Sequence, residues 1–182
     1  MRTVTHELVG VTLAIAAGHV AGASGSELAG LAAGAFVGSL LPDVDHPRAR
    51  VHRRTRLERR SPLVRLLVAP VRLALRAVGA LGPHRGITHS AAACAAVAVL
   101  LALAASAAGA AAATLAAAGA GIGYTAHVLA DACTPGGVLL WAPLSRRPAW
   151  VLPRGARIRT GSLRELAFAA LVAAALAALV WS

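Results

Sequence analysis

The stretch Ala91–Ala130, AAACAAVAVLLALAASAAGAAAATLAAAGAGIGYTAHVLA, decides the fold. It is built mostly of alanine, leucine, valine and glycine, and Ser106–Gly109 divides it into the runs Ala91–Ala108 and Ala110–Ala130. Each run approaches the about 20 residues that a helix needs to span a bilayer. Because alanine and leucine favour helix, the stretch predicts two membrane helices joined by a short turn.

Three further apolar runs are candidate helices. They are Leu163–Trp181, Leu8–Ala21 and Leu28–Leu41. The first of these is long enough to span a bilayer, whereas the other two are short and predict a helical hairpin that dips into the membrane or crosses it. The expected fold is therefore all-α, a multi-pass membrane bundle of four to five membrane helices in a single domain over residues 1–182.

Glycines recur every four residues in the run Leu28–Leu41, at positions 30, 34 and 38. Small residues at this spacing let two helix backbones approach closely inside a membrane. We therefore expect this run to pack tightly against another helix. The alternative that the N-terminus is a secretory signal peptide is disfavoured, because Thr5 and His6 belong with the polar motifs described below.

The charge of the chain is confined to a few segments. The net charge is +11 with 58% apolar residues, and all basic residues are arginine. Apolar runs separated by basic loops are typical of membrane proteins, so no direct binding of nucleic acid is expected. Within the basic loop 48–82, Arg65, Arg72 and Arg76 share one face of an amphipathic helix, kinked at Pro70, that would lie on anionic membrane lipids. A solvated linker is the alternative there.

The arginines also predict an orientation. They occur at position 2, from 48 to 85 and from 146 to 164, including the basic loop 144–162, and nowhere else. With the helices above, these regions fall on one side of the membrane, and arginine-rich loops stay in the cytoplasm. The sequence predicts a protein of the inner membrane with its basic loops in the cytoplasm.

Histidines and aspartates gather at the predicted helix ends on that same side. The candidate metal ligands are His6, Asp43, Asp45, His46, His84, His89, His127 and Asp131. His127 and Asp131 are four residues apart, so both project from one helix face. Imidazole and carboxylate ligands together suit zinc, with manganese or iron as alternatives. This many ligands would serve one or two ions; the alternative is polar filling of helix ends.

Other polar residues are assigned simpler roles. Thr88 or Ser90 is expected to cap the helix that begins at Ala91. His19 is expected to be either a packed histidine or one on the opposite face, and His52 a solvated loop residue. Cys133 is not expected to be a ligand. Glu58 and Glu165 lie among arginines in the sequence and are interpreted as solvated counter-charges.

The motifs SLLPDVDHP (39–47), HRGITHS (84–90) and GYTAHVLADACTPGGVLLWAP (123–143), with Thr5-His6 before them, resemble the YdjM-type family of inner-membrane metal-dependent hydrolases. That family is distantly similar to zinc-dependent phospholipase C and nuclease P1. The resemblance implies His127 and Asp131 as ligands, with Asp131 as a bridge, and His6 on one metal. Asp43 or Asp45, with His84 or His89, would complete the other.

The expected function is that of a membrane-bound metal-dependent hydrolase. Metal-activated water would attack a phosphoester or phospholipid-like substrate at the cytoplasmic face, with Asp45, Arg85 and Asp131 as the catalytic candidates. Arg85 would clamp a phosphate or extend to the headgroups. The alternative is a non-enzymatic membrane protein with a structural metal site and a basic loop that docks a partner. Transport is disfavoured, because no ionisable residue except His19 falls in the middle of a predicted span.

Overall fold

The computed structural model describes residues 1–45, 61, 62, 66, 69 and 86–181. Several predicted features lie outside these residues. They are the amphipathic helix with Arg65, Arg72 and Arg76, and the side chains of His46, His52, Glu58, His84 and Arg85. Asp45 is described in its backbone only.

The described chain contains five α-helices, which confirms the all-α prediction. They are α1 (Thr3–Val20), α2 (Gly25–Gly38), α5 (Ala91–Ala108), α6 (Ala111–Ala132) and α7 (Leu163–Val180), with the short 3-10 helices η1 (Pro42–Asp45), η3 (Ile87–His89) and η4 (Arg154–Ala156). An isolated bridge between Val138 and Ala149 is the sole β pairing within these residues.

Local signals explain where the helices begin and end. Ser90 caps α5 by accepting a hydrogen bond from the Ala93 N–H at 3.1 Å, as expected. Ser24 and Glu27 form a capping box at the start of α2. Gly109 ends α5 with a φ of +64°, a left-handed conformation that glycine adopts at no steric cost.

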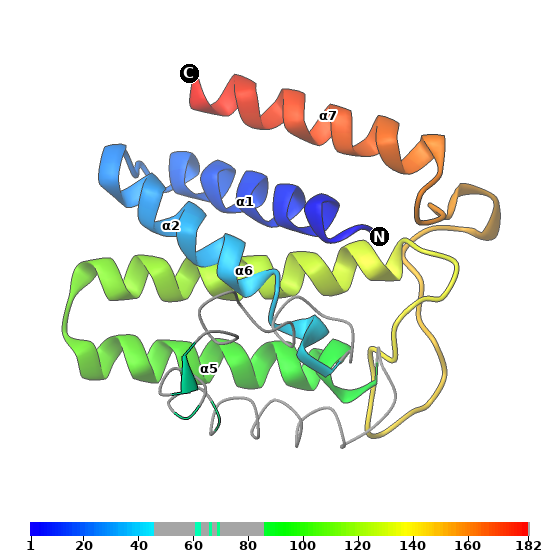
Figure 1. Ribbon diagram of the computed structural model, residues 1–182, viewed down its shortest axis with the longest axis horizontal. Helices are drawn as coiled ribbons and strands as arrows, with labels where there is room; N and C mark the ends of the chain where they lie inside the picture. Colours follow the sequence, from blue (N-terminus) through cyan, green and yellow to red (C-terminus); the bar gives the residue numbers. More distant parts are fainter. Residues whose placement is uncertain (46–60, 63–65, 67–68, 70–85, 182) are drawn as a thin grey trace.

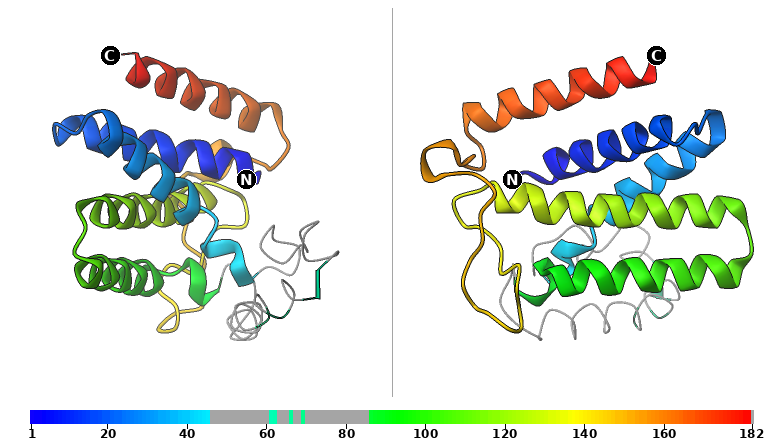
Figure 2. Two further views of the ribbon diagram at one scale, coloured as in Figure 1. Left: turned by 60° about the vertical axis from the view of Figure 1, so that its left-hand side comes forward. Right: turned by 180° about the vertical axis from the view of Figure 1, so that it is seen from behind.

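The helices lie side by side in a bundle whose centre is α6. Figure 1 shows α7 over α1 at one edge and α5 at the opposite edge, with α2 crossing α6 between them. Both views of Figure 2 show that the N-terminus and the start of α7 share one end of the bundle, while the C-terminus lies at the other. We call the first of these the N-terminal end of the bundle.

Glycines bring α2 and α6 into direct backbone contact. A Cβ added to Gly34 or Gly38 would lie 2.0 Å from the carbonyl oxygen of Ala116 or Ala120, respectively. Gly119 and Gly123 of α6 make the reciprocal approach to backbone carbonyls of α2. The predicted close packing of this helix is confirmed.

Within the part of the chain that the structure describes, three helices are long and apolar enough to cross a membrane: α5, α6 and α7. In α5 and α7 only 6% of the span is buried inside the protein, whereas in α6 it is 39%. Helices α5 and α7 therefore present their apolar side chains outward, as lipid contact requires. Of the four to five membrane helices expected, three meet this criterion; α1 and α2 do not.

The described arginines all lie at the N-terminal end of the bundle. They are found at position 2, in the loop before α7 and in its first turn. The α1–α2 and α5–α6 connections at the opposite end contain none. Among the residues that the structure describes, the arginines therefore share one end of the bundle; those from 48 to 85 lie outside these residues.

Candidate metal centre

Five predicted ligand residues converge at the N-terminal end of the bundle. They are His6 of α1, Asp43 of η1, His89 of η3, and His127 and Asp131 of α6. The side chains of four are at most 2% exposed, whereas that of Asp43 is 29% exposed. Segments that are far apart in the sequence thus bring their most polar side chains to one buried point.

His127 is oriented by the end of α2. Its Nδ1 donates a hydrogen bond of 2.6 Å to the carbonyl oxygen of Ser39, which is itself fully buried. Because Nδ1 is engaged by Ser39, Nε2 is the ring nitrogen that faces the carboxylates of Asp43 and Asp131, at 3.4 and 3.9 Å. A backbone acceptor that fixes a histidine tautomer in this way is typical of metal-ligating histidines.

His89 is oriented by contacts around η3. Tyr124 of α6 donates a hydrogen bond of 2.5 Å from its hydroxyl group to the carbonyl oxygen of Thr88, and the Thr88 hydroxyl lies 3.0 Å from Nδ1 of His89. Ser90, besides capping α5, donates to the Ile87 carbonyl oxygen at 2.7 Å. The second ring nitrogen, Nε2 of His89, is therefore the one that faces the cluster.

Four of these side chains form a closed ring, which we call the His–Asp ring. Nε2 of His89 lies 3.8 Å from Oδ1 of Asp43 and 3.6 Å from Oδ2 of Asp131. Nε2 of His127 completes the ring through the same two oxygens. Ligand atoms around a tetrahedral zinc ion are about 3.3 Å apart, so the spacing within the ring is close to that of a metal site.

His6 lies on the other side of Asp131. Its Nε2 is 3.3 Å from Oδ1 of Asp131, and its ring stacks on that of His127 with a centroid separation of 3.8 Å. The amino group of Met1 lies 3.2 Å from the same Oδ1. The two oxygens of Asp131 therefore face different partners. Oδ2 faces His89 and His127 of the His–Asp ring, whereas Oδ1 faces His6 and the Met1 amino group.

Burial and charge set the protonation of the residues outside the membrane spans. Burial lowers the pKa of His6 to about 4, because it disfavours the imidazolium form. Burial alone would raise the pKa of Asp43, but hydrogen bonding to His127 and the nearby histidines outweigh it and lower the pKa to about 2. At neutral pH the His6 imidazole is therefore uncharged and Asp43 is a carboxylate. These are the forms in which the two side chains bind metal ions.

The donor set fits a divalent ion. His6 Nδ1 and His127 Nε2 are buried and accept no hydrogen bond from the described residues, and imidazole with carboxylate suits zinc, manganese or iron. Among the described residues, two groups have the spacing for an ion, His6–His127–Asp131 and Asp43–His89–His127. Because Nδ1 of His127 is bonded to Ser39, its single Nε2 lone pair serves one ion only. Asp131, with two oxygens, is the group able to bridge to a second.

The other predicted site residues are placed as follows. Asp45 is the last residue of η1, two positions after Asp43, while His46, His84 and Arg85 lie outside the described residues. His19, which was expected to stand apart, lies near the far end of α1 and belongs to neither ligand group. Cys133 directly follows α6 and is also in neither group.

The interpretation of Glu165 as a solvated counter-charge is wrong. Glu165 is only 2% exposed. Its carboxylate accepts hydrogen bonds from the backbone N–H groups of Arg2 and Gly161, each at 2.5 Å, and from the Thr5 hydroxyl at 3.2 Å. These donors satisfy the buried carboxylate and tie the start of α7 to the start of α1, next to His6. The pattern Ser162-x-x-Glu165 is a capping-box motif and could have placed Glu165 in a first helical turn.

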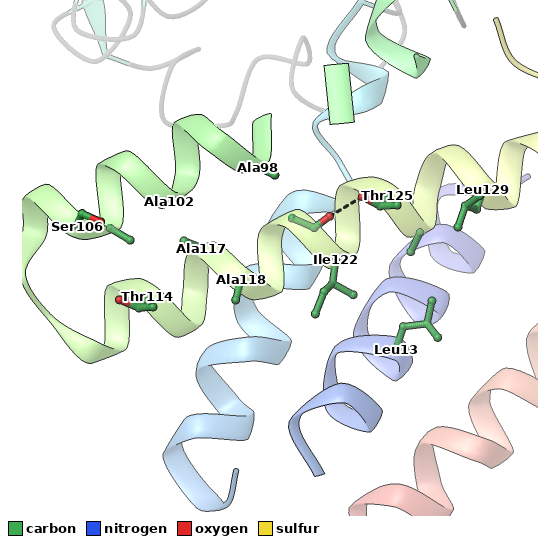
Figure 3. A pocket seen from close by; sticks show the side chains of 13 residues that line it. Leu13, Ala98, Ala102, Ser106, Thr114, Ala117, Ala118, Ile122, Thr125 and Leu129 are labelled. Atoms are coloured by element: carbon green, nitrogen blue, oxygen red, sulfur yellow. Dashed lines mark hydrogen bonds between the residues drawn. The ribbon is translucent and has the colours of Figure 1, made fainter. Parts of the chain in front are cut away.

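An apolar groove between α1, α5 and α6 is separate from the metal centre. Figure 3 shows its lining of small side chains from α5 and α6, with Leu13 contributed by α1. Its volume is about 610 Å³, and none of the five clustered His and Asp side chains lines it. It lies between two candidate membrane helices, where a lipid-facing surface is expected.

Comparison with known proteins supports the resemblance noted from the sequence. The model of the YdjM inner membrane protein family matches residues 1–182, the full length given. No curated protein and no solved structure matches the chain, so the more distant similarity to phospholipase C and nuclease P1 stays a prediction. With three helices suited to crossing a membrane and a matching family model over all its residues, this chain belongs to the YdjM inner membrane protein family.

Proposed function

We propose that this protein is a membrane-bound hydrolase that uses a divalent metal ion to cleave a phosphoester or phospholipid-like substrate at the cytoplasmic membrane face. The observation that carries the proposal is the His–Asp ring, in which two histidine nitrogens and two carboxylate oxygens face one another at 3.4–3.9 Å. A cluster of this kind, buried at the end of an apolar bundle, is costly unless it serves a function.

The residues that would hold the ion are His89, His127, Asp43 and Asp131. His6 and the second oxygen of Asp131, which also contacts the Met1 amino group at 3.2 Å, would be donors to another. A bound zinc or manganese ion would lower the pKa of water and polarise a phosphoryl oxygen. The protein's own contribution is orientation: Ser39 fixes His127, and the Tyr124–Thr88 contact fixes the segment that carries His89. Small changes in these contacts would misplace the ligands.

Exposure favours a catalytic centre over a structural one. A structural zinc site is closed by protein ligands, whereas a catalytic site keeps a position open for water. Within the ring, Asp43 is 29% exposed while the other three side chains are at most 2% exposed. Solvent therefore reaches the ring beside Asp43, and a substrate would approach from that side.

The location and the charge support the choice of substrate. The centre lies at the end of the bundle that carries the described arginines, next to helices suited to a bilayer. Arginine favours phosphate through paired hydrogen bonds, and a membrane interface gives access to lipid headgroups. The phosphate-clamping role of Arg85 is part of this proposal.

The experiment combines metal analysis with an activity screen on the detergent-solubilised protein. We expect about one or two zinc or manganese ions per chain, and cleavage of a chromogenic phosphodiester. His127→Ala and Asp131→Ala should each lose metal and activity, while His19→Ala, which removes a histidine outside the centre, should keep both.

Two results separate the alternatives. Bound metal with no hydrolysis of any phosphoester in the screen would favour the structural metal site and a role in partner docking. Folded wild-type protein that takes up no divalent ion would contradict both the hydrolase and the structural alternative.

A further inference from the structure

Four arginines line one cavity beside the start of α7. The cavity measures about 670 Å³ and is bounded by the loop after α6 and the first turn of α7. Its lining includes Arg154, Arg157, Arg159 and Arg164, together with Ser162, the N-cap of α7. None of the five clustered His and Asp residues of the metal centre belongs to it.

The positive charge in this cavity is not neutralised within the described part of the chain. No carboxylate there forms an ion pair with any of the four guanidinium groups, and Glu165, the acid next to Arg164, is buried against the start of α1. The amino end of α7 adds the positive end of a helix dipole. Four like charges around one hollow repel one another, so an anion bound among them would lower their electrostatic energy.

Two of the four arginines, and the loop that carries most of them, are held by contacts within the protein. Arg157 stacks over the ring of Trp150 at 4.1 Å, and its Nε donates to the Leu152 carbonyl oxygen at 3.2 Å. Arg164 donates to the Gly155 carbonyl oxygen at 2.7 Å. The loop itself is anchored to the end of α6, because the Ile158 N–H bonds the Cys133 carbonyl oxygen at 3.0 Å.

Two arginines remain available for a ligand. Arg154 and Arg159 are exposed, and neither side chain makes a hydrogen bond to the residues that the structure describes. The cavity therefore contains two arginines held in place, Arg157 and Arg164, and two whose guanidinium groups can turn toward a ligand, Arg154 and Arg159. Guanidinium groups bind phosphate oxygens in a bidentate manner, and preorganisation reduces the entropic cost of binding.

We infer that this cavity is a binding site for a phosphate group, which is carried either by an anionic phospholipid headgroup or by a soluble phosphate. Both sources offer the same chemistry, and the cavity lies at the first turn of a candidate membrane helix, where either could reach it. The inference does not depend on the proposed hydrolase activity, because it concerns binding alone.

The test is calorimetric titration of the full-length protein in a non-ionic, phosphate-free detergent and without added metal. The probes are sodium phosphate and monomeric dihexanoyl phosphatidylglycerol. The test variant is Arg154→Gln/Arg159→Gln. The matched control is Arg146→Gln/Arg147→Gln, which removes the same charge from two exposed arginines that do not line the cavity.

We expect at least one probe to bind, with an affinity about tenfold or more weaker in the test variant and nearly unchanged in the control. Binding of the lipid alone identifies a headgroup site, and binding of phosphate alone identifies a site for soluble phosphate. If neither probe binds, the cavity is not a phosphate site. If both variants weaken binding equally, the arginines of the cavity act only through general charge, and the cavity is again not a phosphate site. Circular dichroism of each variant verifies that it is folded.

Discussion

Ser39 and His127 connect the end of α2 to the candidate metal centre, because the Ser39 carbonyl oxygen accepts a 2.6 Å hydrogen bond from Nδ1 of His127. The position of that carbonyl depends on how closely α2 approaches α6. The approach in turn depends on Gly38, the residue before Ser39, which lies against the backbone of Ala120. Helix packing and ligand orientation are therefore coupled through one backbone group.

Gly38→Ala should weaken metal binding without altering any ligand. The added Cβ would lie 2.0 Å from the Ala120 carbonyl oxygen, so α2 must shift and carry Ser39 away from His127. Displacing a group that hydrogen-bonds a metal-ligating histidine typically costs about tenfold to a hundredfold in metal affinity. Competition with a chelating dye measures the effect.

Gly30→Ala is the matched control for that measurement. It makes the same substitution in the same helix, but its Cβ would meet only the Leu115 side chain at 3.5 Å, an ordinary contact. Equal loss of metal affinity in the two variants would show that the Ser39–His127 contact does not matter.

The α2–α6 contact should also dominate the stability of the bundle. Gly119→Ala would place a Cβ 2.1 Å from the Leu31 carbonyl oxygen, and forced overpacking of this kind costs about 1–3 kcal/mol. Gly121→Ala, two residues along the same helix, meets nothing within 4 Å. It should be neutral or stabilise by up to about 1 kcal/mol, because alanine loses less backbone entropy than glycine.

Thermal unfolding in detergent, followed by circular dichroism, compares these two variants directly. A melting temperature that falls for Gly119→Ala and is kept or raised for Gly121→Ala is the expected pattern. The reverse order would mean that α2 and α6 do not pack as described.

Glu165→Gln should destabilise the N-terminal end of the bundle by about 1–3 kcal/mol. The buried carboxylate accepts from two backbone N–H groups and one hydroxyl, and an amide would set its NH₂ group against one of these donors. Glu27→Gln changes an exposed capping-box carboxylate and should cost only about 0.5 kcal/mol. Similar melting temperatures for the two variants would argue against the α1–α7 contact.

The sequence predicted the helices best where an apolar run is bounded by clear end signals. Ala91–Ala108 was predicted to the residue, because Ser90 and Gly109 are strong end signals. The first helix was expected from Leu8 but begins at Thr3. Its first turns carry Thr5 and His6, which are buried by Glu165 and Asp131 rather than by apolar packing. Hydropathy cannot detect a helix end whose polar residues point inward.

The candidate site was predictable in kind but not in detail. His127 and Asp131 share a helix face by their spacing alone. Spacing could not indicate that Ser39 and Tyr124 orient the ligands, because these two contacts join residues that are 88 and 36 positions apart. The orientation of Glu165 likewise depends on how α7 packs against α1, which no local pattern encodes.

The orientation in the membrane can be tested by cysteine labelling. In a chain with Cys94→Ala and Cys133→Ala, single cysteines are introduced as Ala110→Cys, at the α5–α6 connection, and Ala156→Cys, in the basic loop; both positions are exposed. Because arginine-rich loops stay in the cytoplasm, a membrane-impermeant maleimide should label position 110 in intact cells and position 156 only after permeabilisation. Labelling of both sites in permeabilised cells is the control for accessibility. Labelling of position 156 in intact cells would place the candidate metal centre on the outer face and exclude a cytoplasmic substrate.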